Sequence, residues 1–399
     1  MDELDALRHM RTALAQEEHP DRIALRTDWR GGAARPRRSL KIPVVSLAAT
    51  AALVVGVVAV VPLRSDRGVT PGPGRSGAVI RQGDVLLVAA ARAQEAPVGE
   101  YWHTKSVSGR IYAVGTSAAD HYKVDSRQGS ESWTDRSGKG RSAHIELADV
   151  PLTAQDERKW QAAGSPELVR IPAPEGAARS VYLDMEPPSV KDPGWRPAAD
   201  RYYGLAPDQI AKLPTEPEAL ENALLNLRGR WQAYSSKTGK EPIRALRGQQ
   251  RVRALSDVAA TLLSTAPAPP TVRAAVFRML ATQPGVRAEG RATDPLGRTG
   301  TVISLPLETT VPLGLYTAPK QLGTYRRQLV ISPDTGRLLA ILDLVATPPR
   351  GSRKLPTGDD GESRSLKARN MPDRFHRPGE LASYQVFEVT EWTDTEPPR

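Results

Sequence analysis

Polar and apolar residues alternate from residue 100 to 147, which is typical of strands with one packed face and one exposed face. The segment Tyr-Trp-His-Thr-Lys-Ser at 101–106 alternates with a period of two. We predict an antiparallel meander of four strands, with the Gly-containing sequences RQGSES and RSGKGR as hairpin turns. These strands are expected at residues 100–114, 120–129, 130–138 and 139–148.

Strand patterns return after residue 285, in two hairpins of similar sequence. Turns are predicted at 294–297 (Asp-Pro-Leu-Gly) and 333–336 (Pro-Asp-Thr-Gly), because Asp caps the local backbone and Gly adopts a positive φ angle. An arginine, Arg298 or Arg337, opens the strand after each turn. A last strand is predicted at 381–393, so close to the C-terminus that the chain's end is expected to close the sheet.

Between these two regions the apolar period changes to that of helices. Thr215 is a suitable N-cap for the longest of them, and Pro284-Gly285 stops the last. The predicted helices of this block span 206–214, 214–234, 256–265 and 271–283.

Two further regions complete the fold prediction. A helix is expected at 83–96, with Leu86, Leu87, Ala90 and Ala91 facing a core, and residues 150–200 are expected to form loops and one short helix. Strand patterns lie on both sides of the helical block, and neither side has enough helices to cover its own sheet. The prediction is therefore one α+β domain over residues 83–395, with a curved antiparallel sheet packed on helices.

The segment from Ile42 to Leu63 has no charged side chain and consists mostly of Ala and Val. A bilayer core needs roughly 20 apolar residues, whereas a cleaved signal peptide has a shorter apolar run after a short basic start. A buried globular helix is the remaining alternative, but so uniformly apolar a stretch is typical of membranes. We predict a transmembrane helix at 42–63.

The charges around this segment predict its orientation. Lys and Arg crowd residues 30–41, fewer follow the apolar run, and such cations tend to stay cytoplasmic. The predicted topology is a single-pass cell-membrane protein with a cytoplasmic segment at 1–41, a Gly/Pro linker at 64–82 and an extracellular C-terminal domain.

Within the cytoplasmic segment, residues 2–16 have a narrow apolar stripe at helical spacing, formed by Leu4, Leu7 and Leu14. This amphipathic helix is a candidate site for binding a cytoplasmic partner. The alternative, a frayed helix lying on the membrane surface, has equal weight, because so short a helix is marginal in water.

The composition narrows the choice of partners. A formal net charge of +10 suggests nucleic acid, but the arginines are scattered and no aromatic residues alternate with them. We therefore expect no nucleic-acid partner, and read the charge as solvation or as attraction to an anionic cell surface. The chain has no Cys, so no disulfide stabilises it and no lipid is attached to a cysteine.

No constellation of residues predicts catalysis, a cofactor or a metal. His103, His121 and His144 fall in the meander, and the first two are able to approach one another across a hairpin, but no paired carboxylates accompany them. Nucleophile-elbow, zinc-protease and phosphate-loop motifs are absent from the sequence. The acidic GDDGES at 358–363 lacks EF-hand spacing, and turn geometry explains the Asp and Arg of DPLGRTG.

The segments FRMLATQPGVRAEGRATDPLGRTGTVIS and LVISPDTGRLLA resemble those of a family of uncharacterised single-pass membrane proteins from high-GC Gram-positive bacteria. The segments LLVAAARA, GEYW and LPTEPEAL are similar too, so the resemblance covers most of the chain outside the linkers. Association with extracytoplasmic-function sigma factors, which the resemblance implies, suggests a signalling role. The element order is also distantly similar to the half-barrel fold of lipoprotein carriers, which implies an apolar groove for acyl chains.

The predicted topology and the resemblance suggest two classes of function. The first is a membrane-anchored extracytoplasmic binding or sensing protein that modulates a cytoplasmic regulator such as a sigma factor. The alternative is a tethered half-barrel domain that handles a lipid or lipoprotein. A deep apolar pocket between sheet and helices would favour the alternative, and a filled core would favour a partner-binding module.

Overall fold

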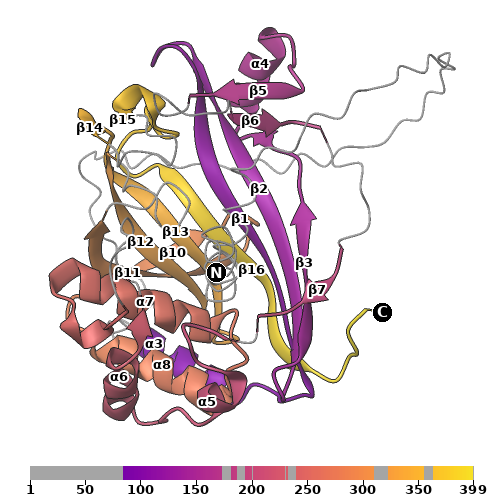
Figure 1. Cartoon of the computed structure of the whole chain (residues 1–399), viewed down its shortest axis with the longest axis vertical. Coiled ribbons are helices and arrows are strands. Elements are labelled where there is room, and N and C mark those ends of the chain that lie inside the picture. The colour runs from indigo at the N-terminus through magenta and orange to yellow at the C-terminus, as the bar shows by residue number, and fades with distance from the viewer. Residues whose placement is uncertain are drawn as a thin grey trace, which may run out of the picture.

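The structure is a computed structural model that describes residues 84–172, 181–186, 194–199, 201–229, 231, 240–309, 322–354 and 363–398. A ten-stranded antiparallel sheet dominates it (Figure 1). The strands are ordered β10-β11-β12-β13-β16-β1-β2-β3-β7, with β4 paired to β2. Their bounds are β1 Tyr101–Gly115, β2 His121–Asp135, β3 Gly140–Glu146, β4 Val150–Pro151, β7 Arg196–Pro197, β10 Arg287–Thr293, β11 Thr299–Thr309, β12 Thr324–Ser332, β13 Arg337–Thr347 and β16 Leu381–Thr393.

The remaining described elements are small strand pairs and helices. Three two-stranded sheets pair β5 (Leu168–Ile171) with β6 (Val181–Asp184), β8 (Arg228–Gly229) with β9 (Glu241–Pro242), and β14 (Ser352–Lys354) with β15 (Ser365–Lys367). The helices are α3 Asp84–Gln94, α4 Ala154–Ala162, α5 Pro207–Ala211, α6 Pro217–Leu225, α7 Gly248–Leu263 and α8 Pro270–Thr282, with the 3₁₀ turns η1 Ile243–Ala245 and η2 Ala368–Asn370.

The last strand, β16, lies at the centre of the sheet rather than at an edge. It pairs with β13 on one side and β1 on the other, so it joins the strands that precede the helical block to those that follow it. The predicted strands on both sides of the block thus belong to one continuous sheet.

The long hairpin of β1 and β2 corrects the predicted meander. Its register runs unbroken from Tyr101 opposite Asp135 to Gly115 opposite His121. The sequence RQGSES is therefore part of one fifteen-residue strand and not a turn. Gly129, which suggested a turn, is instead needed for close packing, because a Cβ there would lie 2.9 Å from the Cβ of Ile145 on β3.

Two apolar clusters cover the ends of one face of the sheet. At the lower end in Figure 1, α3, α6, α7 and α8 gather against β11, β12 and β13, with Phe277 and Leu329 buried between them. At the upper end, α4 and the β5–β6 pair cover Tyr122 and Val124 of β2. Burying each large side chain contributes about 1.5–3 kcal/mol, so both ends are firmly packed.

Three helices differ from their predictions in detail. Helix α7, predicted at 256–265, begins at Gly248 and ends at Leu263. In α3, Leu86 and Ala90 are buried as predicted, but Leu87 is 50% exposed and Ala91 is exposed, because the buried stripe continues through Ala89 and Ala93 instead. The predicted 214–234 helix ends at Leu225, and its N-cap is Glu216 rather than Thr215.

The fold class is also corrected. The α+β prediction with a transmembrane helix gave the helices too much weight, since the described chain is mostly a large antiparallel sheet with few and short helices. The longest described helix, α7, has sixteen residues and α8 has thirteen, whereas β1 and β2 have fifteen residues each.

The structure gives no support to a single-pass membrane protein with an extracellular domain. None of the helices in the described ranges is long and apolar enough to cross a membrane. The longest of them, α7, has sixteen residues and includes Arg251, Arg253 and Asp257. The predicted transmembrane helix at 42–63, the cytoplasmic segment at 1–41 and the 64–82 linker all lie outside the described residues.

Candidate functional site

The register of the central strands shows which side chains share the helix-covered face. Trp102 donates a hydrogen bond from Nε1 to the Thr265 carbonyl in the α7–α8 loop, at 3.1 Å, so the even-numbered residues of β1 face the helices. Successive side chains of a strand alternate between faces, and cross-strand partners share a face. The assignment therefore extends from β1 to β2, β3 and β16 through their register.

Between its two apolar ends, this face carries mostly neutral polar side chains, together with Arg110, which lies opposite Ser126 and Ser383 in the register. Four adjacent strands contribute them, and most are partly exposed. We call this surface the serine face, and its residues are Ser106, Ser108, Ser126, Gln128, Ser130, Ser132, Ser142, Ser383 and Gln385.

Hydrogen bonding within the serine face is sparse. The Ser106 and Ser130 hydroxyls lie 3.5 Å apart, and the Gln128 amide lies 2.8 Å from Nδ1 of His144. The Gln385 amide nitrogen is buried and has no partner within the described part of the chain. Buried polar groups usually have partners, so within the described residues the Gln385 amide retains an unused hydrogen-bond donor.

A charged group on the same face ties the sheet to α7. Arg327 donates two hydrogen bonds of 2.9 Å to the Asp343 carboxylate and another to Asp257 on α7. Burial alone would lower the pKa of Arg327, but the two carboxylates raise it overall. The Ser383 hydroxyl lies 3.4 Å from the same Asp343, whose oxygens are thus already engaged and poorly placed to activate a nucleophile.

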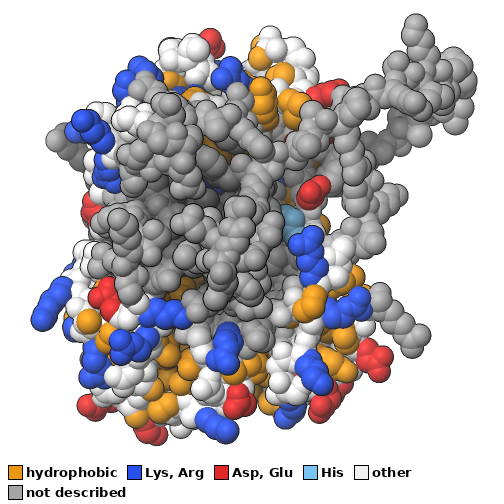
Figure 2. Space-filling model, in the orientation of Figure 1, with side chains coloured by type: hydrophobic (Ala, Val, Ile, Leu, Met, Phe, Trp, Pro, Cys, Tyr) orange, Lys and Arg blue, Asp and Glu red, His pale blue; other side chains and the backbone are white. Residues whose placement is uncertain are grey.

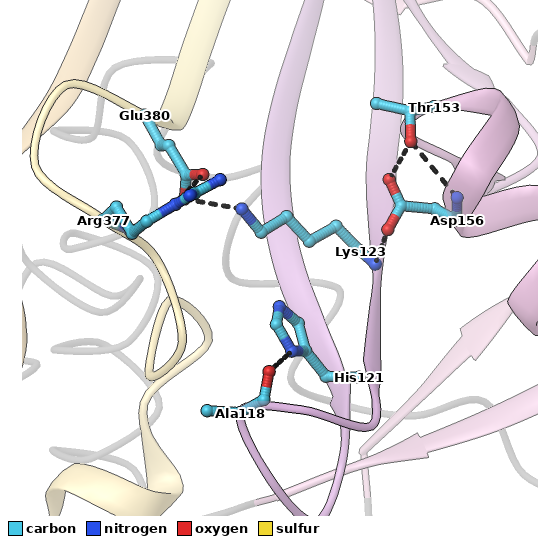
Figure 3. Close-up of polar contacts among 7 residues, drawn as sticks. All are labelled: Ala118, His121, Lys123, Thr153, Asp156, Arg377 and Glu380. Carbon is cyan, nitrogen blue, oxygen red and sulfur yellow. Dashed lines mark hydrogen bonds and ion pairs between the residues drawn. The ribbon is translucent and has the colours of Figure 1, made fainter.

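A second polar cluster lies at the upper end of the β1–β2 hairpin (Figure 3). The Lys123 ammonium donates to Glu380 at 2.5 Å, and the Lys123 backbone N–H donates to Asp156 of α4 at 2.8 Å. Asp156 also accepts a hydrogen bond from Thr153, the N-cap of α4. Lys123 thus joins β2, α4 and the segment before β16, which is a structural role.

The acid in this cluster is held in its ionised form. Burial alone would raise the pKa of Glu380, but hydrogen bonds from Lys123 and from the Arg377 backbone lower it overall. The side chain of Arg377 also donates to Glu380, from Nε at 3.2 Å. The side chains of Lys123 and Arg377 thus both hold the Glu380 carboxylate in the loop that precedes β16.

Two buried titratable groups on neighbouring elements have shifted pKa values of opposite sense. Burial raises the pKa of Asp125 to about 6, although the Tyr384 hydroxyl donates a 2.7 Å hydrogen bond to it. Burial lowers the pKa of His376 to about 4, with Lys123 adding to the effect. Both ring nitrogens of His376 are buried without a hydrogen-bond partner among the described residues, although the nearby Leu381 backbone offsets a small part of the lowering of its pKa.

The three histidines of the meander do not form a metal site. His103 bonds to Glu131 at 2.8 Å and stacks on Trp133, whereas His121 bonds to the Ala118 carbonyl. His103 and His121 lie at opposite ends of the hairpin, about 40 Å apart along the strand, so the predicted approach between them is wrong. The described residues contain no group of three or more potential metal ligands.

The turn residues of DPLGRTG have the structural role expected of them. The Asp294 carboxylate accepts hydrogen bonds from the backbone N–H groups of Leu296 and Arg298, and Gly297 has a φ of 81°. Arg298 also donates to the carbonyls of Phe387 and Leu339. The candidate partner-binding residues Leu4, Leu7 and Leu14 lie outside the described residues. The same holds for the acidic segment 358–363, of which only Ser363 is described.

Sequence reasoning missed the serine face. Its signal was the alternation of small polar residues at 126, 128, 130 and 132, which continues through the glycine taken for a turn. The buried pair of Asp125 and Tyr384 had no local signal, because 259 residues separate its members.

Charged side chains do not gather into one patch on the face that Figure 2 shows. Lys and Arg are spread over the helices and the rim, with Asp and Glu between them. Comparison with protein-family models, curated proteins and solved structures gives no match. The resemblance to the sigma-factor-associated family and to the half-barrel fold therefore remains a prediction.

Proposed function

We propose that the folded region is a binding or sensing module that recognises a polar ligand through the serine face. The observation that carries this proposal is the register, which aligns hydroxyl and amide side chains of four strands on one face between two packed apolar ends. Such side chains recognise hydrogen-bonding partners and provide little binding to hydrocarbon.

The packing of the described residues supports this proposal over the handling of acyl chains. Helices already cover the apolar side chains at the lower end, where Phe277, Leu263 and Ile303 are all 0% exposed. An acyl chain on the remaining stretch would displace water from serine hydroxyls without replacing their hydrogen bonds. Lipid or lipoprotein binding is therefore the second candidate.

Regulation of a cytoplasmic partner such as a sigma factor is a separate proposal. It depends on the stripe of Leu4, Leu7 and Leu14, for which the described fold offers no argument. Changing Leu7 and Leu14 together to Asp should abolish recovery of such a partner, since two anions would replace the apolar contact surface.

The serine face is tested with the full-length protein purified from its native source. Ser126→Leu and Ser130→Leu replace hydroxyls on the face, and Ser352→Leu, at an exposed site on β14, is the matched control. We expect a bound polar ligand or partner, identified by mass spectrometry, to be lost from the first two variants and retained by the control. Near-ultraviolet circular dichroism checks that each variant is folded.

Two results would contradict the proposal. One is recovery of the same partner at equal yield from all three variants. The other is an acyl lipid in organic extracts of the wild type, which would favour the lipid-handling alternative.

A further inference from the structure

Arg273, in the first turn of α8, is a buried cation without a counter-ion. Its side chain is 3% exposed, and the described residues provide it with no carboxylate and no hydrogen-bond acceptor. Its guanidinium carbon lies 5.2 Å from the centroid of the Trp102 ring. A cation–π contact compensates only part of the cost of burying a charge.

A second cation adds to this charge. Burial and, to a lesser extent, the positive charge of Arg337 together lower the pKa of Arg273 to about 10. Arg337 donates to the Thr390 hydroxyl at 3.2 Å and to the Glu388 carbonyl at 3.3 Å. Its contact with a carboxylate is weak, since Glu391 lies 3.6 Å away and is 51% exposed.

Three buried polar atoms around Trp102 have no partner within the described ranges. They are Nε of Arg273 and the hydroxyls of Thr265 and Thr134. Thr265 accepts the Trp102 hydrogen bond through its carbonyl, and Thr134 lies directly opposite Trp102 in the register. Buried donors without partners are rare in native proteins unless an ion or a water molecule satisfies them.

The position on α8 favours negative charge as well. A helix of thirteen residues carries partial positive charge at its N-terminus, where Pro270 begins it. Nε of Arg273 is therefore a buried donor next to this helix terminus that has no partner within the described residues.

We propose that Arg273 and Arg337 form a binding site for a small oxyanion, of the phosphate or carboxylate class, with Trp102 as one wall. The guanidinium fork matches both classes, and the threonine hydroxyls supply further donors. This site goes beyond the serine face, and its existence does not depend on the function proposed for that face.

The test is thermal unfolding of the full chain in inorganic phosphate, in acetate and in chloride at equal ionic strength. Phosphate or acetate should raise the unfolding midpoint of the wild type by about 5 °C at a hundredfold excess over Kd, relative to chloride. Arg273→Gln should lose this shift. Arg158→Gln, which removes an exposed cation from α4, should retain it and so controls for net charge.

The two anion arms distinguish the ligand classes. A larger shift with phosphate assigns a phosphate site, and a larger shift with acetate assigns a carboxylate site. The absence of any anion-specific shift in the wild type would overturn the proposal even if Arg273→Gln does not fold. An equal shift in folded Arg273→Gln and in the wild type would overturn it too.

Discussion

The buried carboxylate of Asp125 destabilises the fold near neutral pH. Burial raises the pKa of Asp125 to about 6, against about 3.9 in an unfolded chain. Its stabilising contribution is therefore fully present below about pH 4 and is lost as the pH rises through 6. The side chain of Asp125→Asn cannot ionise, and its amide oxygen still accepts the Tyr384 hydrogen bond. Its amide nitrogen, however, takes the place of Oδ1, and Oδ1 has no partner among the described residues.

For Asp125→Asn we expect the free energy of unfolding near pH 7 to rise by about 1 kcal/mol, because the removed charge outweighs the unpaired amide. Urea denaturation of variant and wild type across this pH range is the measurement. A variant that is less stable than the wild type at neutral pH would contradict the argument.

His376 has the opposite dependence. Its pKa is lowered by burial to about 4, against about 6.5 when unfolded. Its contribution is therefore present above about pH 6.5 and is lost as the pH falls through 4. Leu has a similar volume to His and does not titrate. Between about pH 6.5 and 4, the free energy of unfolding of His376→Leu should therefore fall by about 3 kcal/mol less than that of the wild type.

The two residues should nearly cancel in the wild type, which predicts a flat stability profile between about pH 4 and 6. In Asp125→Asn only His376 of the pair still titrates, so the free energy of unfolding should fall as the pH is lowered from 6 to 4. In His376→Leu only Asp125 still titrates, so it should rise over the same range. Profiles of the same slope in both variants would show that other groups dominate.

At this scale, the sequence supports local predictions and fails for distant ones. Asp294 and Gly297 predict a turn from local effects alone: the Asp side chain accepts hydrogen bonds from nearby backbone N–H groups, and Gly adopts a positive φ angle. The structure confirms this turn. Gly129 was misread because a glycine needed for cross-strand packing looks the same as a turn glycine in the sequence. The destination of the Arg298 side chain, a carbonyl 89 residues away, has no local signal at all.

At the scale of elements, the contact between α3 and the β12–β13 turn depends on Gly336. Its φ is 63°, and a Cβ at this position would lie 2.4 Å from the Ala89 carbonyl oxygen of α3. Gly297 in the other hairpin has a φ of 81° but no atom within 4 Å of its ideal Cβ. Substituting Gly297 and Gly336 therefore separates two contributions to the loss of stability: backbone strain, which both positions share, and the clash with α3, which only Gly336 has.

Gly297→Ala should cost about 1 kcal/mol from the left-handed conformation alone. Gly336→Ala should cost about 3 kcal/mol, since it must also displace α3. Chemical denaturation measures both values, and equal costs would show that α3 does not depend on this contact.

The bounds and buried faces of the helices could not be predicted from the sequence for a physical reason. Helix α6 stops at Leu225, although the apolar period continues in the sequence, and β8 with β9 then forms a strand pair that no local pattern indicated. The exposed Leu87 of α3 shows the same limit, because tertiary packing selects which apolar stripe of a helix is buried.

At the scale of the whole molecule, the continuous sheet connects the two ends of the sequence. The serine face requires β16 beside β1, a pairing between segments nearly three hundred residues apart. Its residues were visible in the sequence, but their assembly on one face was not, because it depends on register rather than on local pattern.

A chain that ends at residue 283 tests whether this sheet is the unit of folding. It would lose β10, β11, β12, β13 and β16, so β1 would become an exposed edge. The apolar faces of α7 and α8 would also lose Ile303, Leu329 and Leu338, which cover them in the described fold. We expect no cooperative thermal transition and strong binding of an apolar dye, because half of the core would be missing.

The control is a chain of residues 84–398, which keeps all the described elements and should unfold cooperatively. Calorimetry of both chains is the measurement. A cooperative transition in the shorter chain would show that the part before residue 283 folds independently. The domain would then divide at the helical block, because β1 to β3 with the helices would bury enough apolar surface to be stable without β16.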